Sequence, residues 1–185
     1  MNRARGSAAR SIAGRLAASA WRSAVPLAAL LTTAGASAEG FTINDLTPIG
    51  DAAAAALGPG YIFRAEPKRV SLYCAECTGS PMIDILLGTE DYGAEESLRL
   101  GLTSAADVER KCQSRNDGCR IRELDIAPAV GWVSQYPRPR GDGATAYIMR
   151  DGQLLTLRVI SSSIGTSSEV MERLLPLARE KIIGR

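Results

Sequence analysis

Short runs of apolar residues alternate along most of the chain with polar segments that contain Gly, Pro, Asn or Asp. Runs of about four to eight residues that are rich in β-branched and aromatic side chains are typical of β-strands. We therefore expect strands at residues 61–64, 70–73, 82–87, 121–126, 129–136, 144–149 and 154–160. The run at 82–87 is almost continuously apolar, which predicts a central strand of a sheet.

The last two predicted strands should form a β-hairpin. Asp151-Gly152 separates them, and this dipeptide is strongly favoured in the tight turns of hairpins. From Leu155 to Val159 every second residue is apolar, while Arg158 occupies an alternate position. Because successive side chains of a strand point to opposite faces, one face of the hairpin should be buried and the other mostly in contact with water.

Two helices are predicted in the first two thirds of the chain. The N-terminal helix has Thr47 as its cap and contains the alanine run at 52–56. A middle helix from about 105 to 115 has Thr103 or Ser104 as its cap and acidic residues in its early turns, where the helix dipole favours them.

A C-terminal helix is predicted by a start signal and by an apolar stripe. Thr166 and Glu169 have the spacing of a capping box. Apolar residues then recur at the spacing of one helix face, namely Met171, Leu174, Leu175, Ala178 and Ile182. Pro176 should kink this helix, because its ring removes a backbone hydrogen bond and clashes with the preceding turn.

The order of these elements predicts an α+β fold. The chain runs through a helix, three strands, a helix, four strands and a helix. This order suits an antiparallel β-sheet of about six or seven strands, covered by an N-terminal, a middle and a C-terminal helix. The sequence contains no internal repeat and no sign of a second domain. We therefore expect residues 39–185 to form a single α+β domain.

Residues 1–38 have the features of a cleaved secretory signal peptide. They include five arginines and no acidic residue, an apolar run from Val25 to Leu31, and a small-x-small sequence at 36–38. The apolar run is too short to span a membrane, which takes about 20 residues. We expect cleavage after Ala38, a periplasmic or secreted mature protein, and no membrane insertion. A mitochondrial presequence is the alternative, since it is also rich in Arg, Ser and Ala.

Charge and composition exclude several classes of function. The chain has 22 basic and 20 acidic residues; without the five arginines of the leader, 17 basic residues remain and the net charge becomes −3. This balance gives no support for binding to nucleic acid or to an anionic membrane. The absence of histidine removes Ser-His-Asp and Cys-His catalysis and histidine metal sites. We therefore predict no catalytic residue, no cofactor and no metal.

The four cysteines are Cys74, Cys77, Cys112 and Cys119, and in a small exported domain we expect them to form two disulfides. Local pairing joins the first two and the last two, and an Asn-Asp-Gly turn brings the last two together. Either crossed pairing would close longer loops and stabilise the fold more, by about 4 rather than about 2 kcal/mol for a bridge. We favour local pairing because of the turn.

Two functional interpretations of the cysteines compete with the structural one. The Cys-x-x-Cys motif at 74–77 has the spacing of a dithiol oxidoreductase, which places its first cysteine at the start of a helix, where the dipole stabilises a thiolate. The turn at 78–81 interrupts any such helix, and the carboxylate of Glu76 disfavours a thiolate. A zinc site is disfavoured by the long spacing between Cys112 and Cys119.

The Pro-rich loop that contains Arg138 and Arg140 is the best candidate for contact with a partner. Its alternating Pro and Arg residues hold an extended conformation and present two guanidinium groups, with Trp132 and Tyr136 close in sequence. A solvated hairpin loop is the alternative. The acidic segment at 90–96 lacks the ligand spacing of a calcium site, so we interpret it as a solvated connection.

Together these features predict an exported, non-catalytic accessory or binding protein. We expect it to engage another exported or membrane protein through exposed loops, with its cysteines in structural disulfides. The alternative is a thiol–disulfide oxidoreductase that uses Cys74 and Cys77.

Overall fold

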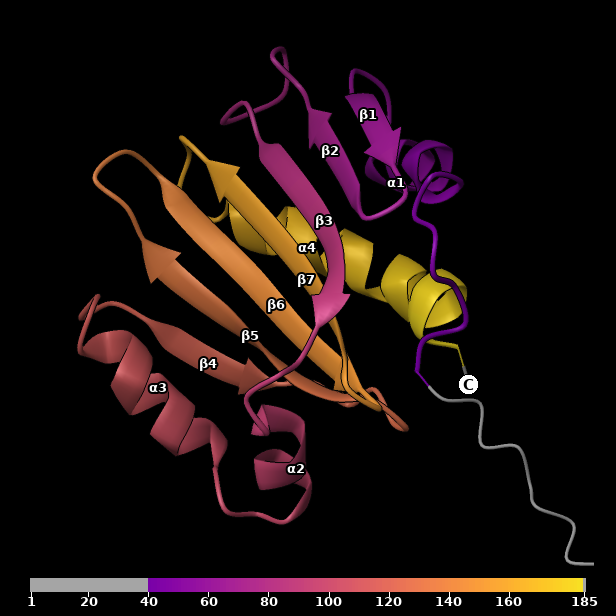
Figure 1. The fold of residues 1–185 in the computed structure, drawn as a ribbon. Helices are drawn as coiled ribbons and strands as arrows, with labels where there is room; N and C mark the ends of the chain where they lie inside the picture. Colours follow the sequence, from indigo (N-terminus) through magenta and orange to yellow (C-terminus); the bar gives the residue numbers. More distant parts are fainter. Residues whose placement is uncertain (1–39, 185) are drawn as a thin grey trace, which may run out of the picture. The chain divides into compact units, whose positions relative to one another are not determined.

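A seven-stranded antiparallel β-sheet forms the centre of the fold (Figure 1). The computed structural model describes residues 40–184, so the predicted signal peptide at 1–38 lies outside the described residues. The strands are β1 (Ile62–Glu66), β2 (Arg69–Tyr73), β3 (Met82–Thr89), β4 (Arg120–Glu123), β5 (Val130–Pro137), β6 (Asp142–Arg150) and β7 (Gln153–Ser161). With its helices and two disulfides, this sheet confirms the predicted α+β fold.

Two antiparallel meanders meet inside the sheet, whose strand order is β1-β2-β3-β7-β6-β5-β4. The chain leaves β3, crosses to β4 at the opposite edge, and returns through β5 and β6 to β7. β3 then pairs with β7 along its whole length, with Ile85 opposite Leu157. The sequence predicts the first meander and the last hairpin, but it does not show that β3 and β7 are neighbours.

The hairpin between β6 and β7 confirms the prediction from Asp151-Gly152. The φ angles of Asp151 and Gly152 are 51° and 77°. A type I′ turn requires positive φ at both central residues, and Asp-Gly accepts this conformation at low cost. The twist of such a turn matches the twist of the strands it connects, so this short signal determines the register of two long strands.

β3 is an interior strand, as its apolar sequence predicts, but it is buried on one face only. Ile83, Ile85 and Leu87 are almost completely buried. Met82, which directly precedes Ile83, is 59% exposed on the opposite face. An apolar side chain therefore remains exposed in the interior of the sheet, which is where the functional argument below begins.

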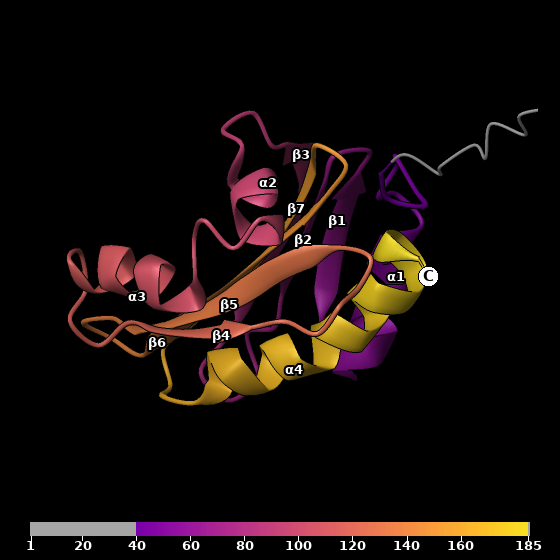
Figure 2. The same ribbon diagram turned by 90° about the horizontal axis from the view of Figure 1, so that it is seen from below.

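The helices are α1 (Ile49–Leu57), α2 (Ala94–Arg99), α3 (Ala105–Gln113) and α4 (Thr166–Ala178), and α4 continues as a π-helical turn at Arg179–Ile183. α1 and α4 lie on one side of the sheet, and α2 and α3 lie on the other (Figure 2). α2 was not predicted, because its acidic sequence was interpreted as a solvated connection. Thr47 does not cap α1, since the helix begins after Pro48 without a side-chain cap. In the described part of the chain, no helix has the length and apolarity needed to cross a membrane.

The starts of α3 and α4 are capped in different ways. Ser104 caps α3, as predicted: its Oγ accepts a hydrogen bond from the N–H of Asp107 at 3.2 Å, and the Asp107 carboxylate accepts one from the N–H of Ser104 at 2.9 Å. The predicted capping box of α4 is wrong. There the carboxylate of Asp142, at the start of β6, accepts hydrogen bonds from the N–H groups of Gly165 (2.6 Å) and Ser167 (3.3 Å).

The hydrophobic core lies between the sheet and the pair α1 and α4. Its largest fully buried side chains include Ile83, Ile85, Ile148, Leu155, Leu157, Met171, Leu174 and Ile182. Full burial of each such side chain contributes about 1.5–3 kcal/mol. The apolar stripe predicted for the C-terminal helix therefore faces the core. Pro176 lies within α4, and the helix continues past it to Ala178.

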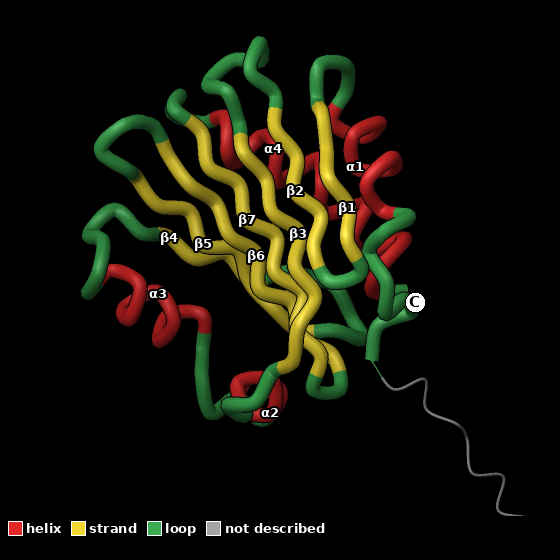
Figure 3. The backbone as a smooth tube through the Cα atoms, turned by 45° about the horizontal axis from the view of Figure 1, so that its top comes forward, coloured by secondary structure: helices red, strands yellow, loops and turns green. Residues whose placement is uncertain are grey.

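The opposite face of the sheet is covered only in part. α3 packs against β4 and β5, and α2 packs against β5. Figure 3 shows α1 and α4 behind the sheet, with no described helix in front of β1, β2 and β3. We call this second surface the open face.

Candidate functional site

A row of apolar side chains crosses the open face. Ile62 of β1 lies opposite Tyr73 of β2. Tyr73 lies opposite Met82 of β3, and Met82 lies opposite Ile160 of β7. Ile160 in turn lies opposite a glycine of β6 that is covered by the ring of Tyr136 of β5. Because directly opposed residues of antiparallel strands have their side chains on the same face, these five residues form one line, which we call the apolar row.

The apolar row is exposed where no helix covers the sheet. Ile62 is 71% exposed, Met82 59% and Tyr73 39%. Leu72 and Ile83, the sequence neighbours of Tyr73 and Met82, point to the other face and are 2% exposed. Single exposed apolar residues are common on protein surfaces, but a continuous group of them marks a surface that binds another molecule.

The first disulfide lies beside the apolar row, directly after Tyr73. Cys74 and Cys77, with their Cα atoms 5.4 Å apart, are joined within the loop between β2 and β3. The far side of the loop is tied to the end of β7, because the carbonyl of Gly79 accepts hydrogen bonds from the N–H and the Oγ of Ser162 at 2.8 and 3.0 Å. The loop that begins after Tyr73 is therefore held rigidly beside the exposed side chains. No helix begins at Cys74.

A cluster of charged side chains lies next to the apolar row. One carboxylate oxygen of Asp84 accepts hydrogen bonds from Arg69 (2.7 Å) and Ser71 (2.9 Å), and the other accepts one from Arg158 (3.1 Å). Burial by itself would raise the pKa of Asp84, but these hydrogen bonds outweigh burial and hold the pKa below its ordinary value. The carboxylate is thus ionised and accepts hydrogen bonds from both arginines. This state suits a structural role, in which Asp84 orients the arginines, and does not suit a proton donor.

The second disulfide positions α3 over the open face at the β4 edge. Cys112 in α3 and Cys119 before β4 are joined, with their Cα atoms 5.8 Å apart. The turn between them is held by Asn116, whose carbonyl accepts a hydrogen bond from the N–H of Cys119 at 2.8 Å and whose side chain donates to the carbonyl of Pro137. The pairing of both disulfides is thus the local one that the sequence favours.

A groove of about 490 Å³ lies between α3 and the open face, and we call it the α3 groove. One wall includes Lys111 of α3 and Arg115 of the turn after it, and the wall on the sheet includes Trp132, Tyr136, Tyr147 and Arg158. The rings of Trp132 and Tyr147 are tilted by 40° with their centroids 5.6 Å apart. The hydroxyl group of Tyr136 is 3.2 Å from the Oγ1 of Thr145. The groove therefore combines aromatic surface with positive charge.

The four residues predicted to bind a partner lie in two different regions of the structure. Trp132 and Tyr136 line the α3 groove, and Tyr136 also ends the apolar row. Arg138 and Arg140 are exposed in the connection between β5 and β6 and do not line the groove. The sequence did not predict the cations of the groove or the exposed members of the row, Ile62, Tyr73 and Met82. A single apolar or basic residue in a strand or helix does not indicate whether its side chain is exposed.

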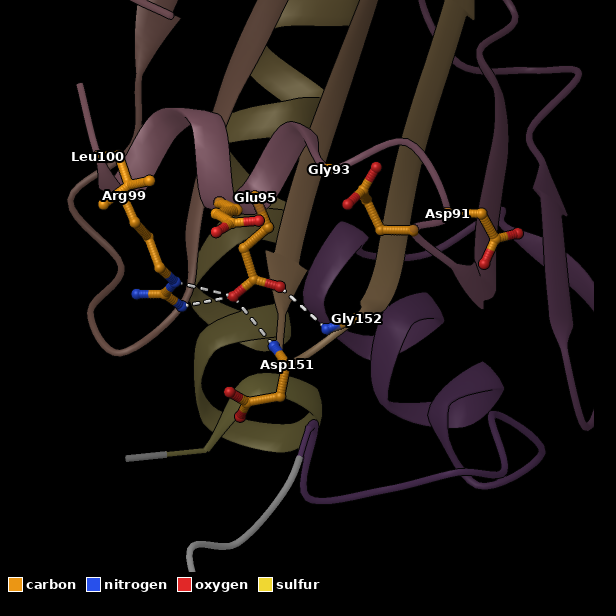
Figure 4. A pocket seen from close by; sticks show the side chains of 9 residues that line it. Asp91, Gly93, Glu95, Arg99, Leu100, Asp151 and Gly152 are labelled. Carbon is orange, nitrogen blue, oxygen red and sulfur yellow. Dashed lines mark hydrogen bonds and ion pairs between the residues drawn. The ribbon is translucent and has the colours of Figure 1, made fainter. Parts of the chain in front are cut away.

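An acidic pocket is lined by α2, by the segment before it and by the turn between β6 and β7 (Figure 4). One carboxylate oxygen of Glu95 accepts hydrogen bonds from Arg99 (2.7 Å) and from the N–H of Asp151 (3.0 Å). The other oxygen accepts one from the N–H of Gly152 (2.9 Å). Glu95 is 8% exposed, and its contacts fasten α2 to the β6–β7 turn. Among residues 40–184, no group of three or more His, Cys, Asp or Glu side chains is placed to hold a metal ion.

The chain matches no protein-family model, and neither curated proteins nor solved structures include a match to it. The function is therefore inferred from the surface described above.

Proposed function

We propose that this protein is an exported, non-catalytic accessory protein that binds another exported or membrane protein through its open face. The observation that carries the proposal is the apolar row, which stays exposed across β1, β2 and β3 while the opposite face of the same strands is buried. Burial of such a row against a partner releases ordered water and supplies the apolar centre that protein interfaces typically have.

The loop closed by Cys74 and Cys77 supports the choice of this surface. The loop follows directly on Tyr73, is closed by a disulfide, and is hydrogen-bonded to the end of β7. A surface that is rigid before binding loses less conformational freedom on association, so its contacts contribute more to affinity. The sequence predicts binding through exposed loops. We now propose that the partner contacts one rigid loop, at 74–81, and the strands beside it.

A non-catalytic role is supported by the state of the reactive groups. All four cysteines are in disulfides. The carboxylates of Asp84, which is partly buried, and of Glu95, which is buried, are occupied by hydrogen bonds from arginines and backbone N–H groups. Cys74, which would be the attacking thiol of an oxidoreductase, is 1% exposed. A buried sulfur without a helix N-terminus behind it is a poor attacking group, which argues against the redox alternative.

Export is supported by the two disulfides, since such bonds persist in oxidising compartments, and by the basic and apolar leader pattern. Arg64 and Arg69 lie beside the apolar row, and each is paired with a carboxylate, Glu66 at 2.8 Å and Asp84 at 2.7 Å, so charged groups of both signs form a polar rim for the proposed contact.

Site-specific photocrosslinking in the exported full-length protein tests this proposal. A benzophenone amino acid at Met82 should give a defined crosslinked product with one partner. The same group at Ile164, an apolar position that is 87% exposed outside the row, should not. The substitution Ile62→Ser should reduce the Met82 product, because it removes the neighbouring part of the row. Equal products at Met82 and Ile164, or no effect of Ile62→Ser, would contradict binding through the open face.

A further inference from the structure

The charges that line the α3 groove all have the same sign. Lys111 projects from α3, Arg115 from the turn that follows it, and Arg158 from β7, while no Asp or Glu is among the residues that line the groove. The described part of the chain is rich in acidic residues, so the absence of a carboxylate from this groove is a local property and does not follow from composition. A groove with three cations and no anion attracts a negatively charged ligand.

The cations of the groove are available for a ligand. Among the described residues, neither Lys111 nor Arg115 forms a side-chain hydrogen bond or ion pair. Arg158 forms an ion pair with Asp84 at 3.1 Å, which balances part of its charge and orients its guanidinium group, while its other N–H groups have no partner in the described structure. The acid nearest in sequence on α3, Glu109, is already engaged, because its Oε2 accepts the N–H of Ile121 at 2.9 Å.

The rest of the groove is suited to a flat apolar body. Trp132, Tyr136 and Tyr147 place three aromatic rings on the sheet side. Aromatic faces bind planar groups by stacking, and the hydroxyl groups of Tyr136 and Thr145 add polar contacts at a defined place. The volume of about 490 Å³ lies within the range of sites for small organic molecules.

We propose that the α3 groove binds a small organic anion, in which a carboxylate or a similar group is attached to a planar apolar body. The anionic group would contact Lys111, Arg115 and Arg158, and the planar body would lie against Trp132 and Tyr147. A nucleic acid fits less well, because it needs a longer line of cations along its phosphates. This inference does not depend on the binding of a protein partner, since the groove is lined by α3, the turn after it and strands β4 to β7, whereas the exposed members of the apolar row lie on β1, β2 and β3.

Two probes with the same ring and opposite charge test the proposal on the full exported protein by ¹H–¹⁵N NMR. Indole-3-acetate should cause saturable shifts at the amides of α3, β5 and β6 and at the indole N–H of Trp132. Tryptamine, which carries an ammonium group on the same ring, should cause none. These probes separate recognition of charge from general apolar adsorption.

Two matched double variants then test which cations bind the anionic group of the ligand. Lys111→Gln/Arg115→Gln should weaken the binding of indole-3-acetate about tenfold or more, because hydrogen bonds to a charged group are lost. Arg138→Gln/Arg140→Gln removes the same number of charges outside the groove and should leave the affinity unchanged. Both pairs are exposed, so neither should alter the fold.

Several outcomes would overturn the proposal: no saturable shift with indole-3-acetate, equal shifts with tryptamine, shifts centred on Ile62, Tyr73 and Met82, or equal affinity in both double variants. The substitution Ile62→Ser keeps this test distinct from the protein-binding proposal. It should reduce partner crosslinking from the benzophenone at position 82 and leave the binding of indole-3-acetate intact.

Discussion

The carboxylate of Glu95 in α2 accepts a hydrogen bond from the backbone N–H of Gly152, in the turn between β6 and β7, at 2.9 Å. A second N–H of the same turn, that of Asp151, and the side chain of Arg99 complete its contacts. One nearly buried acid thus connects a short helix to a hairpin more than fifty residues further along the chain. This contact explains why an acidic segment without a strong helix signal is ordered.

Glu95→Gln should lower the free energy of unfolding by about 1–3 kcal/mol. The amide keeps only one acceptor oxygen, so at least one N–H of the turn loses its charged partner. Urea unfolding measures the change. Glu96→Gln provides the control, because Glu96 is exposed on the same helix and should change stability by less than about 0.5 kcal/mol. Equal effects of the two substitutions would mean that the Glu95 contact does not stabilise the fold.

Adjacent residues of β3 should respond in opposite ways. Ile83→Ala removes a side chain that is 2% exposed and should destabilise the protein by about 2–5 kcal/mol. Met82→Ala changes a side chain that is 59% exposed and should leave stability within about 0.5 kcal/mol, while it reduces partner binding. Urea unfolding and a partner pull-down separate the two effects. A large loss of stability in Met82→Ala would show that the row belongs to a packed interior.

The two disulfides should contribute similar amounts to stability. Each closes a short loop, so Cys74→Ala/Cys77→Ala and Cys112→Ala/Cys119→Ala should each lower the free energy of unfolding by about 2 kcal/mol. Thiol titration of the natural protein should find no reactive thiol without a reductant. If Cys74→Ser were folded and fully stable but had lost an activity such as insulin reduction, the cysteines would be a redox site and the structural interpretation would be wrong.

Asp84 should make the stability depend on pH in the acid range. Its pKa in the folded protein lies below the ordinary value of 3.8, because the hydrogen bonds from Arg69, Ser71 and Arg158 outweigh the opposing effect of burial. A carboxyl group with a lowered folded pKa stabilises the fold above its unfolded pKa, and that contribution is lost as the pH falls through the folded pKa.

The expected result is a pH-dependent gap between the natural protein and Asp84→Asn. Urea unfolding should find a larger difference near pH 6 than below about pH 3. Asp125→Asn, at an exposed position without a hydrogen-bond partner among the described residues, should show no such trend. A gap that stays constant over this range would mean that the ionised form of Asp84 is not preferred in the fold.

The sequence by itself determined those features whose causes lie within a few residues. Asp151-Gly152 specifies its turn because both residues accept positive φ, and Ser104 caps α3 because its acceptor lies three residues from the N–H it binds. The alternation from Leu155 to Val159 specifies a strand with one buried face, since the side-chain period of a strand is two. The Asn-Asp-Gly turn brings Cys112 and Cys119 together through a local contact, the hydrogen bond from the N–H of Cys119 to the carbonyl of Asn116.

Only the tertiary structure decided which distant residues meet. The cap of α4 comes from Asp142 and not from Thr166 and Glu169, because a carboxylate on a neighbouring strand reaches the N–H groups of Gly165 and Ser167 at the start of the helix. The apolar row from Ile62 to Met82 depends on strand order and on which face of the sheet the helices cover. The same two factors place Lys111 and Arg158 in one groove. Strand order and helix placement depend on how much apolar surface the whole domain buries. No short stretch of sequence contains that information.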